Sequence, residues 1–294
     1  MGTGFMRTVR TFDVINILFL LFISLVSFVP ILHTIALSLS KSYMVEAGMV
    51  GFFPKGWNIH AYERLLDDKQ FLVSFWVSVK RVALTVVSSF IVTLLLAFPL
   101  SRDPKQFILR NPVMWLLIFT LLFNGGLIPF YMTVRDLGLY DTMGALVLPM
   151  IVNVFNVILV VNFFRSIPKE LDECSSMDGA GPFRMLISIY LPLSLPVLAT
   201  ISLFSIVNTW NEYLFGLIFT RSQELMPLQT YLQTVFVKLD PTRMTIEQIK
   251  EAGLISNKSL NAAKILLSLL PIFIVYPFMQ RFFIHGIVLG SVKE

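Results

Sequence analysis

Residues Glu170–Pro196 read ELDECSSMDGAGPFRMLISIYLPLSLP and separate two long apolar segments. The stretch is charged at its start, amphipathic in its middle and apolar at its end. A chain that only had to cross the bilayer again would use a short turn here, whereas this stretch is long enough for about two helices. We interpret it as a docking surface for a partner, flanked by the membrane segments that the partner moves.

The composition is typical of a polytopic membrane protein. The chain has 294 residues, of which 56% are hydrophobic and 14% charged, whereas soluble domains carry about a quarter charged residues. Its apolar residues come in runs of about twenty, the length that crosses a bilayer as a helix. The net charge of +5 indicates no particular partner, because membrane proteins carry surplus Lys and Arg at their cytoplasmic ends. We expect no nucleic-acid partner, since no basic cluster is interleaved with aromatic residues.

The residues that usually carry chemistry are sparse. Cys174 is the single cysteine, so an intrachain disulfide is excluded. The three histidines lie in distant segments without metal-ligand spacing, so we expect no metal site. The chain contains no GxxxxGK[ST] loop, so any ATP-Mg must be bound by another chain. We expect neither an enzyme constellation nor a cofactor bound to this chain.

The hydrophobic pattern predicts an all-α fold with about six transmembrane helices. We expect Asn124-Gly125-Gly126 to loosen or break the third of them. The first apolar run is too long for the h-region of a signal peptide, so we interpret it as an uncleaved span. The predicted spans are Asp13–Leu39, Phe71–Leu100, Pro112–Met132, Thr142–Phe164, Leu193–Thr220 and Ala262–Ile284.

An even number of spans places both termini on the same side. The short connection Ser101–Asn111 lies on that side and carries three basic residues and one acid, which favours the cytoplasm by the positive-inside rule. Two larger connections, Ser40–Gln70 and Arg221–Asn261, then lie outside. The second has helical and turn patterns of its own, so we expect it to meet an external partner; a solvated loop without a role is the alternative.

Polar residues inside spans tend to face protein or water, because burying them in lipid is costly. Glu212 must therefore be paired, neutral, near the interface or beside an aqueous cavity. Helix–helix hydrogen bonding is the alternative role for all these polar residues, and it is the one we favour for Trp210. Lys80 and Arg81 should extend to the interface, with attraction of an anionic substrate as the alternative. The candidate substrate-pathway residues are Asn153, Asn156, Asn208, Trp210, Asn211, Glu212 and Tyr213.

The opening stretch matches the spacing EAA-x3-G-x9-I-x-LP through Glu173, Gly179, Ile189 and Leu191-Pro192. The sequence thereby resembles the EAA loop of permeases in binding-protein-dependent ABC importers. It departs from the motif at Cys174 and Ser175, which replace the two alanines and are also small. The segments TWNEYLFGLIFT and YPFMQRFFIHGIVLGSVKE are similar to the carbohydrate-uptake branch, including the shorter maltose permease subunit and especially the smaller permease subunit of the bacterial alginate importer.

The resemblance implies that the stretch is a coupling helix seated in a groove of an ATPase subunit. Glu170–Met177 can form a helix, and Asp178-Gly179 can turn the chain because glycine accepts positive φ at little cost. Pro182 suits the first turn of a second helix. The residues that the resemblance assigns to ATPase coupling are Glu173, Cys174, Ser175, Asp178, Gly179, Ala180 and Phe183.

The resemblance also implies partners and a mechanism. The partners are a homologous second permease that forms a heterodimer, two ATPase subunits, an external solute-binding protein, membrane lipid and an oligo- or polysaccharide, including acidic ones such as alginate. Transport would proceed by alternating access across the bacterial inner membrane, with no catalysis by this chain. A secondary transporter driven by an ion gradient is the alternative, followed by a non-transport scaffold or membrane enzyme.

We expect three regions along the chain. Residues 1–70 hold the N-terminal tail, the first span and an external loop. Residues 71–284 form the transmembrane core, with the coupling loop at 165–192 and an external loop at 221–261. Residues 285–294 form a cytoplasmic tail, which in the maltose relative reaches the ATPases.

Overall fold

The computed structural model describes residues 11–238 and 257–291, and over this part the secondary structure is helical apart from one isolated bridge between Ser40 and Trp57. The chain divides into two compact units. One unit comprises Met1–Asp68 and Phe236–Leu269, and the other comprises Lys69–Val235 and Leu270–Glu294. Most of the predicted external loop, residues 239–256, and both chain ends lie outside the described residues.

The first unit is built around α1 (Thr11–Ser38), whose apolar side chains are mostly exposed. An apolar helix that is exposed on all sides suits a lipid environment. Within this unit the end of α1 packs on protein, where Ala36 lies against Val45 and Val50. The other helices that the structure describes in this unit are α2 (Ser42–Glu46), α3 (His60–Asp67) and the beginning of α16 (Asn257–Ser291). α3 is amphipathic, and it buries Ala61 and Leu65.

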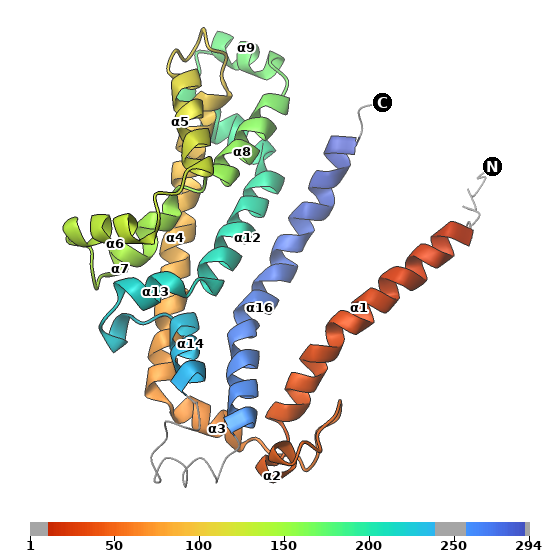
Figure 1. The fold of residues 1–294 in the computed structure, drawn as a ribbon. Coiled ribbons are helices and arrows are strands. Elements are labelled where there is room, and N and C mark those ends of the chain that lie inside the picture. Colours follow the sequence, from red (N-terminus) through yellow and green to blue (C-terminus); the bar gives the residue numbers. More distant parts are fainter. Residues whose placement is uncertain (1–10, 239–256, 292–294) are drawn as a thin grey trace. The chain divides into compact units, whose positions relative to one another are not determined.

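The second unit is organised along α4 (Lys69–Ser101), a helix of 33 residues and therefore about 50 Å long. Figure 1 shows α5 (Arg110–Leu122), α8 (Val154–Ser166) and α12 (Leu195–Asn211) running beside it. One face of α4 carries small side chains four residues apart, except where Arg81 lies between Ser78 and Thr85, and they let the neighbouring helices approach closely. These buried residues are Ser74, Ser78, Thr85, Ser89, Thr93 and Ala97.

Shorter helices complete this unit. A core of Leu100, Val157, Phe164, Tyr190 and Leu198 joins α4, α8 and α12 near the cytoplasmic connections expected from the sequence. The remaining helices are α6 (Leu127–Asp136), α7 (Met143–Ile151), α9 (Glu170–Met177), α10 (Pro182–Met185), the π-helical turn η1 (Leu186–Tyr190), α11 (Leu191–Leu193), α13 (Leu214–Phe219), η2 (Gln223–Leu225) and α14 (Leu228–Lys238).

Among the described residues, four helices are long and apolar enough to cross a membrane, and the number rises to six if two bent helix pairs each count as one span. The first bent pair is α5 with α6, turned by 118°. The second pair joins Pro182–Leu193 to α12, turned by 83°. The all-α fold with about six spans is confirmed. The predicted break in the third span is confirmed too, since α5 ends at Leu122 and Gly126 adopts φ +91°.

The fourth and fifth spans differ from the continuous helices that we expected. Val152 interrupts the fourth, and Asn153 caps the second half by accepting a hydrogen bond from the Asn156 N–H at 3.2 Å. The fifth was expected to run from Leu193 to Thr220, but α12 ends at Asn211 and a separate α13 follows. At both breaks a polar side chain accepts a hydrogen bond from a backbone N–H that has no partner within its helix. Such hydrogen bonds allow a helix to be interrupted in an apolar environment.

Candidate functional site

The predicted coupling loop is a helix, a tight turn and a second helix. α9 ends in a Schellman motif, in which the Ala180 N–H donates to the Ser175 carbonyl at 2.9 Å and the Gly179 N–H to the Ser176 carbonyl at 3.1 Å. Gly179 adopts φ +74°, a conformation that L side chains avoid. Pro182 then opens α10. The expected helix–Gly–helix geometry is therefore present.

The exposed surface of the loop carries both charged and apolar side chains. Glu173 and Cys174 are exposed on α9, whereas Ser175 is buried against the rest of the unit. Met177 is 83% exposed and Phe183 is 67% exposed, one on each side of the Gly179 turn. Large apolar side chains gathered on one exposed loop are typical of an interaction surface.

A cluster of charged and aromatic side chains fastens this loop to the end of α4. The Tyr190 hydroxyl donates to both carboxylate oxygens of Asp172 at 2.9 Å, and Arg102 Nη1 pairs with the same carboxylate. The Arg102 guanidinium lies 4.2 Å from the Phe98 ring centroid and 4.6 Å from that of Tyr190. We call Arg102, Asp172 and Tyr190 the loop clasp.

The loop clasp was not predicted from the sequence. Its signals were present, because Asp172 directly precedes the motif glutamate and Tyr190 occupies the variable position of I-x-LP. The partner residue Arg102 lies in a different connection, and nothing in the sequence places it beside the loop.

A second, exposed ion pair joins the same two connections. Lys169 Nζ lies 3.0 Å from Asp103 Oδ2. The hydrogen bond from Lys169 and its positive charge lower the pKa of Asp103, and the same contact raises the pKa of Lys169. Both side chains are largely exposed, so the pair contributes little to stability.

A cavity of about 410 Å³ lies between the coupling loop and the end of α4. Its lining is polar and includes Gln106, Arg165 and the members of the loop clasp. Arg102 Nη2 is buried there and has no hydrogen-bond partner within the described part of the chain. A buried donor without an acceptor is costly.

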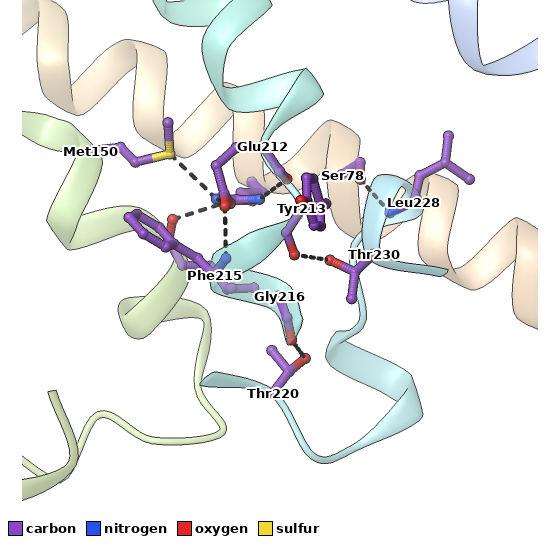
Figure 2. Close-up of polar contacts among 11 residues, drawn as sticks. Ser78, Met150, Glu212, Tyr213, Phe215, Gly216, Thr220, Leu228 and Thr230 are labelled. Atoms are coloured by element: carbon purple, nitrogen blue, oxygen red, sulfur yellow. Dashed lines mark hydrogen bonds and ion pairs between the residues drawn. The ribbon is translucent and has the colours of Figure 1, made fainter. Parts of the chain in front are cut away.

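The break in the fifth span forms a second polar cluster (Figure 2). Arg81 is only 1% exposed, and its Nη2 lies 2.5 Å from Glu212 Oε2. Arg81 Nη1 donates to the Glu212 carbonyl at 3.1 Å, and Nε donates to the Leu146 carbonyl at 3.2 Å. Met150 Sδ accepts a further contact from Arg81 at 3.3 Å. Arg81 thus binds α7 and the α12–α13 break at once.

The expectation that Arg81 extends to the membrane interface is wrong. Its guanidinium is buried against α7 and the end of α12. Burial is possible there because the Glu212 carboxylate forms an ion pair with it and backbone carbonyls accept its hydrogen bonds. Lys80, its neighbour, points to a different face of α4 and is exposed. Of the four environments that we allowed for Glu212, the structure shows the first, a paired carboxylate.

The other predicted pathway residues differ in their surroundings. Asn208, Asn211 and Tyr213 are exposed at the end of α12 and just beyond it. Trp210 is 3% exposed, and its ring lies edge-on to Phe75 with centroids 5.9 Å apart. Asn156 is buried and donates to Ser205 Oγ at 3.3 Å. Their assignment to a substrate pathway stays a prediction, and the exposed set fits it best.

Comparison with known proteins assigns the family. The model of the family described as "Binding-protein-dependent transport system inner membrane component" matches residues 70–287. This chain belongs to that family. The match includes both the coupling loop and the Arg81–Glu212 cluster.

Related permeases cover nearly the whole chain. Protein LplC of Bacillus subtilis (strain 168) is 36% identical over 284 residues, which span 97% of this chain and 95% of that protein. A polygalacturonan/rhamnogalacturonan transport system permease protein, YtcP, of the same organism is 34% identical over 97% of this chain and 99% of its own. A solved chain of a bacterial ABC transporter involved in the import of the acidic polysaccharide alginate superposes with a TM-score of 0.86, at 32% identity, over 96% of this chain and 100% of that one.

Proposed function

We propose that this permease is one half of the pore of an ATP-driven importer that passes an oligo- or polysaccharide across the inner membrane by alternating access. The observation that carries the proposal is the coupling loop, a helix–Gly179–helix unit with Met177 and Phe183 exposed on either side of the turn and Glu173 exposed on the first helix. Two of the similar proteins described above are named for polygalacturonan/rhamnogalacturonan transport and for import of the acidic polysaccharide alginate, which supports a polysaccharide substrate, including an acidic one.

The coupling loop is the part that would meet an ATPase subunit. Rigid seating requires that the loop cannot tilt independently of the spans, and the loop clasp meets this requirement by fastening α9 and Tyr190 to the end of α4. The buried Arg102 Nη2 beside the cavity is suited to an acceptor supplied by the docked partner. ATP-Mg would bind to the ATPase subunits, and this chain would need no cofactor of its own.

The remaining partners follow from the family. A homologous second permease would complete the pore, and a solute-binding protein would deliver the saccharide to the external loop at 221–261. The coupling loop and both chain termini would then lie in the cytoplasm. This orientation agrees with the basic connection between α4 and α5.

The exposed end of α12 supplies groups that suit a saccharide. Asn208 and Asn211 lie one helical turn apart, so their amides share a face, and each amide can both donate to and accept from hydroxyls. Tyr213 adds an aromatic ring with a polar tip. Neutral groups of this kind would let a chain of sugars pass without tight binding.

Reconstitution tests the proposal. The permease is assembled with its second permease, ATPase and solute-binding protein in liposomes, and uptake of oligogalacturonate, alginate oligosaccharide and maltotetraose is measured with and without ATP. We expect uptake of at least one acidic saccharide only when ATP and the binding protein are both present. Uptake that follows an imposed ion gradient and ignores ATP would instead identify a secondary transporter.

A further inference from the structure

Arg81 and Glu212 form a buried ion pair at the point where the fifth span breaks. Arg81 is 1% exposed, and the Glu212 side chain is 17% exposed. Burying such a pair is costly unless the remaining hydrogen-bonding groups are also satisfied. Here they are largely satisfied, since Arg81 also donates to the carbonyls of Leu146 and Glu212, and Glu212 Oε1 accepts from the Phe215 N–H at 2.7 Å.

The two charges also match the helix ends beside them. α12 ends at Asn211, and the Glu212 carbonyl that follows accepts a hydrogen bond from Arg81 Nη1 at 3.1 Å. α13 begins at Leu214. The Phe215 N–H lies in its first turn and donates to the Glu212 carboxylate instead of to a carbonyl of the helix. A cation at a helix C-terminus and an anion at a helix N-terminus are both stabilising. One ion pair therefore holds the two helix ends of the break.

Neighbouring contacts hold the same break from its other side. The Thr230 hydroxyl donates to the Tyr213 carbonyl at 2.8 Å, and the Leu228 N–H donates to Ser78 Oγ at 2.7 Å, as Figure 2 shows. Ser78 lies three residues before Arg81 on α4. The break is thus bound to α4 directly through Arg81 and indirectly through α14.

We propose that Arg81 and Glu212 are a positioning pair, which fixes the break so that Asn208, Asn211 and Tyr213 face the saccharide while Glu212 itself does not contact it. The inference rests on the proposed function and deepens it. Both oxygens of Glu212 are occupied within the chain, and Arg81 is buried. The two charges therefore compensate each other, and the pair presents little net charge to an acidic saccharide.

Three variants of the full transporter separate positioning from substrate contact: Arg81→Met, Glu212→Gln and the double variant. Glutamine at 212 keeps an oxygen for the Phe215 N–H, so the double variant removes both charges and retains the helix cap. The readouts are the yield of assembled complex, the maximal ATP-dependent uptake rate and the half-saturating concentration of the binding-protein–saccharide complex. Asn211→Leu serves as the contrasting variant on the exposed face.

The positioning pair predicts mutual rescue. Each single variant should lower the yield of complex on the order of tenfold, because each leaves a buried charge without its partner. The double variant should recover a yield within about twofold of the natural protein, because no buried charge is left unpaired. Its uptake rate should stay several-fold lower, because Arg81 no longer holds the Glu212 carbonyl at the break. Its half-saturating concentration should not move, whereas Asn211→Leu should assemble normally and take up saccharide slowly.

Two results would overturn the inference. A double variant that assembles normally and takes up saccharide at the natural rate would show that the pair does not position the break. A double variant that assembles as poorly as the single variants would show that the two side chains do not act as a pair. Failure of the proposed function is a separate result, since the unmodified transporter would then show no ATP-dependent uptake, and the yields would still decide whether the pair exists.

Discussion

Tyr190 donates its hydroxyl to both carboxylate oxygens of Asp172 at 2.9 Å, and this contact joins the end of the coupling loop to its beginning. The Tyr190 ring is also buried, edge-on to Phe98 and Phe164 with centroids 5.2 and 5.1 Å away. The residue therefore has two separable roles, one in packing and one in holding the carboxylate that Arg102 also binds.

Tyr190→Phe separates these roles. The ring packing remains, but Asp172 loses a charge-assisted hydrogen bond, so we expect a loss of about 1–2 kcal/mol in the stability of the loop. The number of saccharides imported per ATP should fall while ATP hydrolysis continues, because the loop then tilts without moving α4. Measurement of uptake and hydrolysis on the same liposomes checks this. Lys169→Ala, which breaks the exposed neighbouring pair, should leave the ratio unchanged.

Gly179→Ala tests the turn of the coupling loop. An added Cβ would meet nothing within 4 Å, so its cost comes from the backbone at φ +74° alone and should be about 1 kcal/mol. We expect a lower melting temperature of the purified permease and a smaller amount of ATPase that co-purifies with it. Gly181→Ala is the matched control, because Gly181 has φ −70° and equally open surroundings. Equal effects of the two changes would rule out a special role for the positive φ.

Gly216→Ala tests how closely α13 approaches α14. Its Cβ would lie 2.0 Å from Thr230 Oγ1 and 2.8 Å from Pro227 Cδ, so one helix must move. We expect a destabilisation of roughly 2 kcal/mol, as for other overpacked sites, and a displaced break at Glu212. Thermal unfolding of the purified complex measures the change. Gly125→Ala, where the nearest atom of Phe123 is 4.0 Å away, should cost far less.

The Asp103–Lys169 pair predicts how the loop responds to pH. The pKa of Asp103 is lowered in the folded chain, mainly by the hydrogen bond from Lys169. The contribution of the pair is then present above the unfolded pKa, near 3.9, and it is lost as pH falls through the lower folded pKa. The stability difference between the natural chain and Asp103→Asn should be constant from about pH 6 to 8 and should shrink only below about pH 4. A difference that changes near neutral pH would contradict the assignment.

The sequence predicted the parts of the fold that depend on local pattern. Runs of apolar residues indicated the spans, and the residues Glu170–Pro182 indicated two helices with a turn at Gly179 between them. Asn124-Gly125-Gly126 indicated the break in the third span, because glycine adopts backbone conformations that end a helix.

Long-range pairing could not be predicted in this way. Arg81 follows Lys80 in the sequence, yet Arg81 is buried and Lys80 is exposed. The two side chains leave a helix about 100° apart, and only the packing of α7 and α12 decides which of them meets a carboxylate. The break at Glu212 was missed because Asn211-Glu212-Tyr213 contains neither glycine nor proline. It is stabilised instead by Arg81, 131 positions earlier.

We expect above all that the loop around Glu173 couples this permease to an ATPase. The most direct measurement is the amount of ATPase that co-purifies with the permease, together with saccharide-stimulated ATP hydrolysis, for the natural chain and for Glu173→Arg. Glu224→Arg, at an exposed position in the segment after α13, is the control for co-purification. We predict that Glu173→Arg loses the ATPase and the stimulated hydrolysis while Glu224→Arg retains the ATPase. Retention of both by Glu173→Arg would contradict the claim.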